Sequence, residues 1–173
     1  MNLVKKNIKL KTAVNTSVER HPVPILGIDY KVKIEYRNIK ITELDIEGKT
    51  IRISLPNKYK NIQNNNILDL AIDKMYEQIA KVEIERAMEE IRILVGFAPE
   101  EFEIKEIPQL GKCYNKKITI NPQVVVYNRK VIDYIVLHQY CHLKYKSHTK
   151  GFYKLLEKYM PDYKKYEAIL LNM

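Results

Sequence analysis

The sequence predicts a protein of the α+β class. Between Ile25 and Leu55 apolar and charged residues alternate with a period of two, which is typical of half-buried strands. From residue 64 onward apolar residues recur at helical spacing for almost thirty residues without Gly or Pro. We therefore expect an antiparallel β meander over residues 25–56, followed by a mainly helical core over residues 64–173 with a long helix, short strands and C-terminal helices.

Size and composition suit one domain. The chain has 173 residues, of which 46% are hydrophobic, so we expect residues 1–173 to form a single domain with residues 1–24 flexible. Cys113 and Cys141 form no C-x-x-C pair, and no signal-like segment opens the chain, which predicts a cytoplasmic protein. No apolar run approaches the roughly 18 residues of a spanning helix, so no membrane association is expected.

The expected strands have clear boundaries. Alternating apolar residues lie at Tyr30, Val32, Ile34 and Tyr36 and again at Ile51, Ile53 and Leu55. Glu47-Gly48 supplies the turn between strands, and Pro56 ends the meander.

The middle of the chain is expected to form a long helix and then short strands. Asn64, Asn65 and Asn66 offer N-caps, and Gly96 closes the helix. Its apolar stripe is interpreted as core and comprises Leu68, Ile72, Met75, Ile79, Val82, Met88 and Ile91. Phe102 and Ile104 indicate a strand, residues 111–115 a turn, and residues 117–126 one or two strands in which Pro122 marks an edge or bend.

Three of the four histidines gather in the pattern H-Q-Y-C-H-x5-H, on a helix expected from about Asn128 to Lys144. At 100° per residue, Val131, Ile135, His138 and His142 share the core-facing side, whereas Asp133, Tyr140 and Lys144 lie opposite. Two histidines four residues apart can hold one Zn²⁺, and a third ligand just beyond the helix leaves an open coordination position. His138, His142 and His148 are therefore predicted zinc ligands. Ser147 or Thr149 could cap another helix through Tyr159, and Pro161 suits the first turn of a last helix.

Gln139 occupies the position of the catalytic base in an H-E-x-x-H site. It lies about 60° around the helix from His142, where the glutamate of such enzymes reaches the open metal position. Glutamine can form hydrogen bonds there but cannot accept a proton at neutral pH, and losing a general base costs on the order of 10²- to 10⁴-fold in rate. The sequence thus predicts zinc binding with weak or absent hydrolysis.

The same histidine spacing occurs in metzincins, which place a glycine at the third residue between the second and third ligands. Here that residue is Tyr145, whose bulk fits a left-handed turn poorly, so a metzincin is disfavoured.

The region around the histidines resembles the YgjP-like metallopeptidase family. The resemblance rests on V-I-D-Y-I-V-L-H from Val131 to His138, on C-H-L-K from Cys141, on Ser147-His148 and Phe152, and on Y-M-P-D-Y from Tyr159 to Tyr163. It implies a zincin-like domain of minimal gluzincin type, with the three histidines as zinc ligands. The chain departs from the family pattern at Leu110, Lys112, Gln139, Ser147 and Tyr153.

Several functions stay open at this stage. The resemblance implies peptide hydrolysis, or hydrolysis of UTP, since some family members are described as UTP pyrophosphatases. The net charge of +9, with nine Lys or Arg against four Asp or Glu in residues 129–173, suits an anionic small-molecule substrate, although solvated surface lysines explain it as simply. The alternative is a non-catalytic module that binds nucleic acid or protein. Both cysteines are interpreted as core residues, and Tyr114, Tyr145 and Tyr153 are candidate oxyanion donors, none of which is chosen.

Overall fold

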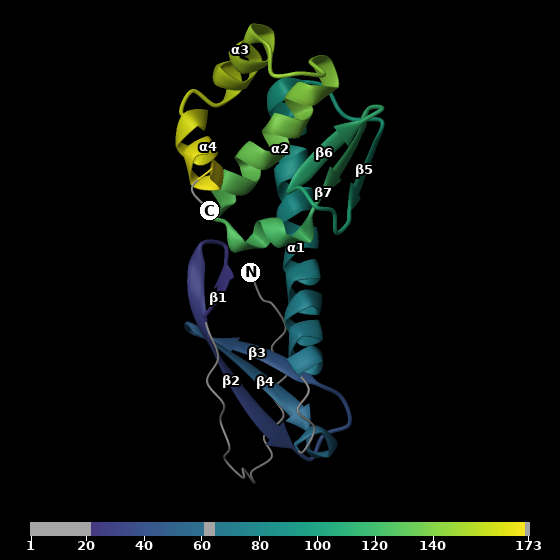
Figure 1. Cartoon of the computed structure of the whole chain (residues 1–173), viewed down its shortest axis with the longest axis vertical. Helices are drawn as coiled ribbons and strands as arrows, with labels where there is room; N and C mark the ends of the chain where they lie inside the picture. The colour runs from purple at the N-terminus through teal and green to yellow at the C-terminus, as the bar shows by residue number, and fades with distance from the viewer. Residues whose placement is uncertain (1–21, 61–64, 172–173) are drawn as a thin grey trace. The chain divides into compact units, whose positions relative to one another are not determined.

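A computed structural model describes residues 22–60 and 65–171 and divides the chain into two compact units (Figure 1). The first unit comprises residues 1–23 and 30–67, and the second comprises residues 24–29 and 68–173. Two small sheets and four α-helices among the described residues confirm the α+β class. The expected flexibility of residues 1–24 concerns mainly residues 1–21, which lie outside the described part of the chain.

The N-terminal sheet has the strand order β1-β2-β4-β3. Its strands are β1 (Val23–Ile25), β2 (Ile28–Arg37), β3 (Glu43–Glu47) and β4 (Thr50–Pro56). The expected turn at Gly48, with φ of 58°, joins β3 to β4 as an antiparallel pair. β2, however, pairs with β4 in parallel, so the prediction of an antiparallel meander is wrong. Alternation of apolar residues determines which face is buried but not which strand pairs with which.

The alternation itself is confirmed. Val32 and Ile34 on β2 and Ile51, Ile53 and Leu55 on β4 are all buried, and each such side chain contributes about 1.5–3 kcal/mol when fully buried. The irregular segment predicted as far as residue 24 is shorter than expected, because β1 already begins at Val23.

The long helix α1 runs from Asn65 to Val95 and ends as predicted at Gly96. Gly96 adopts φ of 77° and donates its N–H to the carbonyl of Arg92, which closes the last turn. The predicted N-cap Asn64 lies outside the described residues. Val82 was assigned to the core but is 37% exposed, and Ala80, Ile84 and Ala87 are fully buried instead.

The second sheet consists of β5 (Glu101–Ile104), β6 (Gly111–Tyr114) and β7 (Lys117–Ile120), in the order β5-β7-β6. The strand predicted at Phe102 and Ile104 is confirmed. The turn predicted for residues 111–115 is wrong, since the chain turns at Asn115 and Lys116, both with positive φ. Residues 122–126, expected as strand, form a 3₁₀ helix whose first residue is Pro122 and whose N-cap is Asn121.

The histidine helix α2 runs from Arg129 to Lys144. Its predicted start is confirmed, because the Asn128 side chain accepts a hydrogen bond from the Val131 N–H. The helix contacts β6, β7, α3 (Lys150–Tyr159) and α4 (Tyr163–Leu171). Of the two predicted caps, Thr149 rather than Ser147 caps α3, whereas α4 begins two residues after Pro161 rather than around it.

Polar contacts attach α2 to α1. Glu83 of α1 accepts hydrogen bonds from Arg86 and, through both carboxylate oxygens, from Arg129 at 2.7 and 2.8 Å, while Arg86 donates to Asp133 at 2.8 Å. The Tyr140 hydroxyl donates to the Met88 carbonyl at 3.1 Å. Asp133 and Tyr140, expected on the face opposite the core, are therefore buried against α1. Helical spacing separates the two faces correctly but does not show that a second helix covers the polar one.

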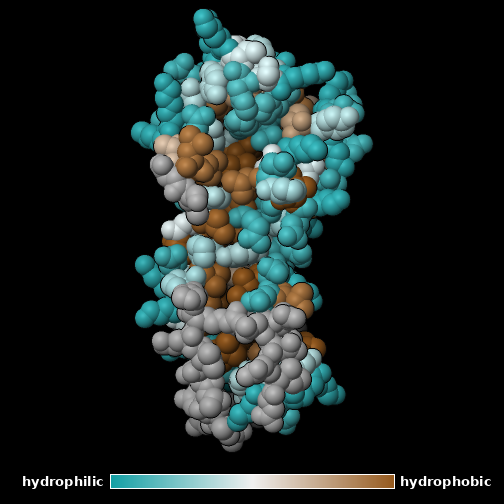
Figure 2. Space-filling view, in the orientation of Figure 1, coloured by the Kyte–Doolittle hydropathy of each residue, from teal (hydrophilic) through white to brown (hydrophobic). Residues whose placement is uncertain are grey.

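Hydrophilic residues cover much of the surface shown in Figure 2, with apolar patches between them. Exposed apolar side chains of the second unit include Ile93, Leu94, Ile169 and Leu171. In the part of the chain that is described, no helix combines the length and apolar character needed to cross a membrane.

Candidate metal centre

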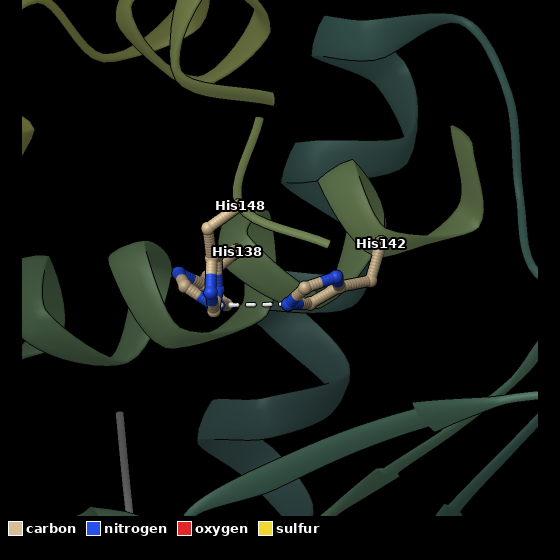
Figure 3. A group of neighbouring side chains, drawn as sticks. All are labelled: His138, His142 and His148. Carbon is tan, nitrogen blue, oxygen red and sulfur yellow. Dashed lines mark hydrogen bonds between the residues drawn. The ribbon is translucent and has the colours of Figure 1, made fainter. Parts of the chain in front are cut away.

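The structure brings the three predicted histidines together. His138 Nε2 lies 3.2 Å from His142 Nε2 and 3.0 Å from His148 Nε2, and Figure 3 shows the rings converging. His138 and His142 lie one turn apart on α2, and His148 comes from the segment between α2 and α3. Together they form a group that could hold a metal ion.

Local sequence explains how His148 reaches the two helical histidines. α2 ends at Lys144 because Tyr145 adopts an extended conformation, with φ of −128° and ψ of 109°. The chain then turns back, and Thr149 starts α3 immediately after His148. Since Tyr145 is not in the left-handed region, the sharp glycine turn of metzincins does not occur here.

A fully buried phenyl ring supports all three imidazoles. The Phe152 ring centroid lies 4.9, 4.7 and 4.7 Å from those of His138, His142 and His148. Phe152 therefore restricts the orientation of all three rings at once. Its position in the sequence, four residues after His148, gave no sign of this role.

The outer nitrogens of the two helical histidines have partners of different kinds. His142 Nδ1 lies 2.9 Å from the Tyr145 carbonyl oxygen. Because a carbonyl only accepts, His142 carries its proton on Nδ1 and leaves the Nε2 lone pair free. His138 Nδ1 lies 3.5 Å from the Tyr134 hydroxyl.

Burial keeps the helical imidazoles in the form that binds metals. Burial, reinforced by His142 and His148, lowers the pKa of His138 to about 4. Burial also lowers the pKa of His142, partly offset by its bond to the Tyr145 carbonyl. At neutral pH both rings are therefore uncharged, as metal coordination requires.

The spacing of the donors fits a tetrahedral metal ion. Two nitrogens bound at 2.0–2.1 Å to one tetrahedral ion lie about 3.3 Å apart, close to the separations between the His138 nitrogen and its two neighbours. The donor set of three imidazoles suits Zn²⁺ and other first-row transition metals.

Gln139 is buried beside this centre. Its side chain is 7% exposed, and a Cβ added at Gly111 of β6 would lie 3.0 Å from its Cγ and 3.1 Å from its Nε2. Gly111 thus allows β6 to approach the amide closely. Among the described residues no hydrogen bond is recorded for this amide, and its polar atoms are not fully buried, so they keep some contact with solvent.

The cysteines and tyrosines singled out in the sequence differ in their surroundings. Cys141 is buried, which confirms its core interpretation, and Cys113 on β6 is half-buried. Burial raises the pKa of both thiols. Tyr153 places its ring 6.1 Å from that of His148, whereas Tyr114 is 66% exposed.

One helix presents two histidines and a third follows it, an arrangement that could hold a metal ion. The chain belongs to the YgjP-like metallopeptidase family, since the family model described as "YgjP-like, metallopeptidase domain" matches residues 2–173.

A solved structure with some similarity is the metallopeptidase zymogen of Pyrococcus abyssi abylysin. The two chains are 22% identical with a TM-score of 0.46, over 51% of this chain and 92% of the other. No curated protein matches the sequence.

Proposed function

We propose that this chain binds one Zn²⁺ through His138, His142 and His148 and hydrolyses its substrates weakly or not at all. The observation that carries the proposal is the contrast between three converging imidazoles and the neutral amide of Gln139 next to them. Zinc suits three imidazole ligands with one open position.

Bound zinc would supply Lewis acidity, polarising a carbonyl or phosphoryl oxygen and lowering the pKa of a coordinated water. The residues of the chain would hold the zinc and orient the histidines that bind it. The Tyr145 carbonyl fixes the proton of His142 on its outer nitrogen, and Phe152 restricts all three rings. Gln139 can donate or accept a hydrogen bond at the base position but cannot take up a proton.

The neighbouring sheet supports a peptide as the ligand. β6 lies at the edge of the three-stranded sheet and contacts α2. An edge strand carries backbone donors and acceptors that can pair with an extended peptide. Gly111, at the start of this strand, brings its backbone against Gln139.

The test compares zinc-loaded wild-type protein with Gln139→Glu on a mixed peptide substrate and, separately, on UTP. We expect wild-type turnover near background and a gain on the order of 10²- to 10⁴-fold in the variant on one of the two substrates. UTP turnover would identify the nucleotide alternative, which the net charge of +9 also suits.

A matched control is Gln78→Glu, which makes the same chemical change at an exposed position of α1. It should leave turnover unchanged. Rapid, chelator-sensitive hydrolysis by the wild-type chain, without any gain from Gln139→Glu, would contradict the proposal.

A further inference from the structure

The exposed face of β6 carries a lysine that pairs with no acidic side chain among the described residues. Lys112 is exposed, and its Nζ lies 5.6 Å from the centroid of the Tyr114 ring, which is also exposed. On the same face of the sheet, Lys117 of β7 pairs with Glu101 and Glu103 of β5 at 3.6 and 2.9 Å. Because Lys117 already pairs with both acids of this face, Lys112 leaves an unpaired positive charge at the edge of the sheet.

The hydrogen bonds between β6 and β7 determine which backbone groups of β6 point outward. The turn between the strands has two residues with positive φ, 46° and 61°, as in a type I′ hairpin, so the residues that flank it exchange hydrogen bonds. Bonded and non-bonded pairs then alternate along the strands, and the 3.0 Å bond from the Asn121 N–H to the Leu110 carbonyl follows the same alternation. The N–H and C=O groups of Gly111 and Cys113 therefore point away from β7, toward the outer edge.

An extended peptide paired antiparallel along this edge would meet Lys112 closely. β6 lies on the α2 side of its sheet (Figure 1), and Gly111 packs against Gln139 of α2. The peptide residue opposite Gly111 would exchange backbone hydrogen bonds with it and lie nearest the metal centre. The residue before it would face Lys112 in a non-hydrogen-bonded pair, in which side chains approach each other more closely than in a bonded pair.

We infer that the centre takes extended peptides with an acidic residue immediately before the position nearest the metal, and that Lys112 selects this residue. Opposite charges directly across two strands attract, whereas like charges repel. The net charge of +9 also favours the encounter with an acidic peptide. The inference rests on the proposed function, because it names the substrate class of the same centre.

The test measures peptide binding to zinc-free protein, so that its result does not depend on the metal. The probes are three capped, fluorescein-labelled heptapeptides that alternate Ser and Val and differ only at the central residue, which is Glu, Gln or Lys. Fluorescence anisotropy measures their affinities. We expect the Glu peptide to bind about 1.4- to 5-fold more tightly than the Gln peptide and the Lys peptide to bind most weakly. Added NaCl should reduce these differences.

The principal variant is Lys112→Glu, which should reverse the order of the three affinities, and Lys112→Gln should abolish the preference between the Glu and Lys peptides. Lys105→Glu is the matched control. It makes the same change at an exposed position just after β5, at the other edge of the sheet, and should keep the wild-type order. Hydrogen exchange followed by NMR locates the peptide, which should slow the exchange of the outward amides of Gly111 and Cys113.

Three outcomes would overturn the inference: no binding of any of the peptides, equal affinity of the wild-type chain for all three, or an unchanged order in Lys112→Glu. Zinc affinity, measured separately by competition with a chromogenic chelator, keeps the two proposals distinct. A chain that binds zinc but shows no charge preference would overturn the inference alone. A chain that binds no zinc, yet reverses its preference on Lys112→Glu, would overturn the proposed function and leave the selection by Lys112 standing.

Discussion

His138 and Gln139 are adjacent on α2 but have opposite surroundings. His138 faces two other imidazoles, a phenyl ring and a tyrosine hydroxyl, so each of its ring nitrogens has a neighbour. Gln139 is packed against Gly111 and, among the described residues, has no recorded hydrogen bond. Holding a metal and taking up a proton are therefore separate properties of the helix. The three histidines could hold a metal ion, and under the proposed function the amide of Gln139 leaves the base position without a proton acceptor.

Removing one ligand tests the first half of the comparison and has the largest expected effect. His142→Ala leaves two imidazoles and should weaken zinc affinity by on the order of 10³-fold or more, since each ligand carries a large share of the binding free energy. Chelator competition measures the change. His21→Ala removes the one histidine outside the group and should leave zinc affinity unchanged. An equal loss in both variants would show that zinc does not bind specifically through the three grouped histidines.

Introducing a charge at Gln139 tests the second half. In zinc-free protein Gln139→Glu places a carboxylate where the side chain is 7% exposed, which should lower the free energy of unfolding by about 1–3 kcal/mol, because a buried charge without a partner is unfavourable. Zinc should restore much of this loss. Chemical denaturation with and without zinc provides the measurement, and a variant as stable as wild type without metal would show that the position is wetter than the structure indicates.

The contacts that hold α2 against α1 should contribute to stability without affecting zinc affinity. Glu83→Gln removes the charge that holds Arg86 and Arg129, and should cost about 1–3 kcal/mol of stability while zinc affinity changes by less than about 2-fold. Arg129 is 57% exposed and can be rehydrated, which places the expected cost toward the lower end. A large loss of zinc affinity would mean that the contacts of Glu83 at the start of α2 also determine the geometry of the histidines.

The Glu83 carboxylate should also make the stability of the folded protein depend on pH. Hydrogen bonds from Arg129, and then from Arg86, hold the pKa of Glu83 below its ordinary value of 4.5. Its contribution to stability is therefore fully present above about pH 4.5 and is lost as the pH falls through the lowered value. Denaturation of zinc-free protein between pH 6 and pH 3 should show a steeper decline for wild type than for Glu83→Gln, and parallel curves would argue against this assignment.

The smallest effect is expected at Gly151. A Cβ there would lie 2.7 Å from Cε1 of Tyr145, the residue whose carbonyl holds His142. Because the ring can move aside, Gly151→Ala should weaken zinc affinity only about 2- to 5-fold, well below the 10- to 100-fold typical of losing an outer partner altogether. Lys150→Ala, at the preceding exposed position of α3, is the control. A loss as large as that of His142→Ala would show that Tyr145 has no room to adjust.

The sequence predicts those parts of the molecule that depend on local patterns. The bounds of the histidine helix, the caps at Asn128 and Thr149 and the glycine end of α1 follow from spacing and capping residues. The convergence of the three histidines follows from helical periodicity plus a short connection.

Features that depend on distant contacts could not be predicted in this way. Parallel pairing of β2 with β4 joins strands with another strand between them in sequence, and the strand at Gly111 depends on positive φ at Asn115 and Lys116. Burial of Asp133 and Tyr140 depends on α1 covering that face of α2. Phe152 was not recognised as a neighbour of all three histidines, because its role arises only when α3 packs against α2.

The most direct test of zinc binding is metal analysis of the wild-type protein after saturation with zinc and removal of free metal by gel filtration. We expect one zinc per chain, retained through filtration. A chain that folds but retains no zinc at neutral pH would contradict it.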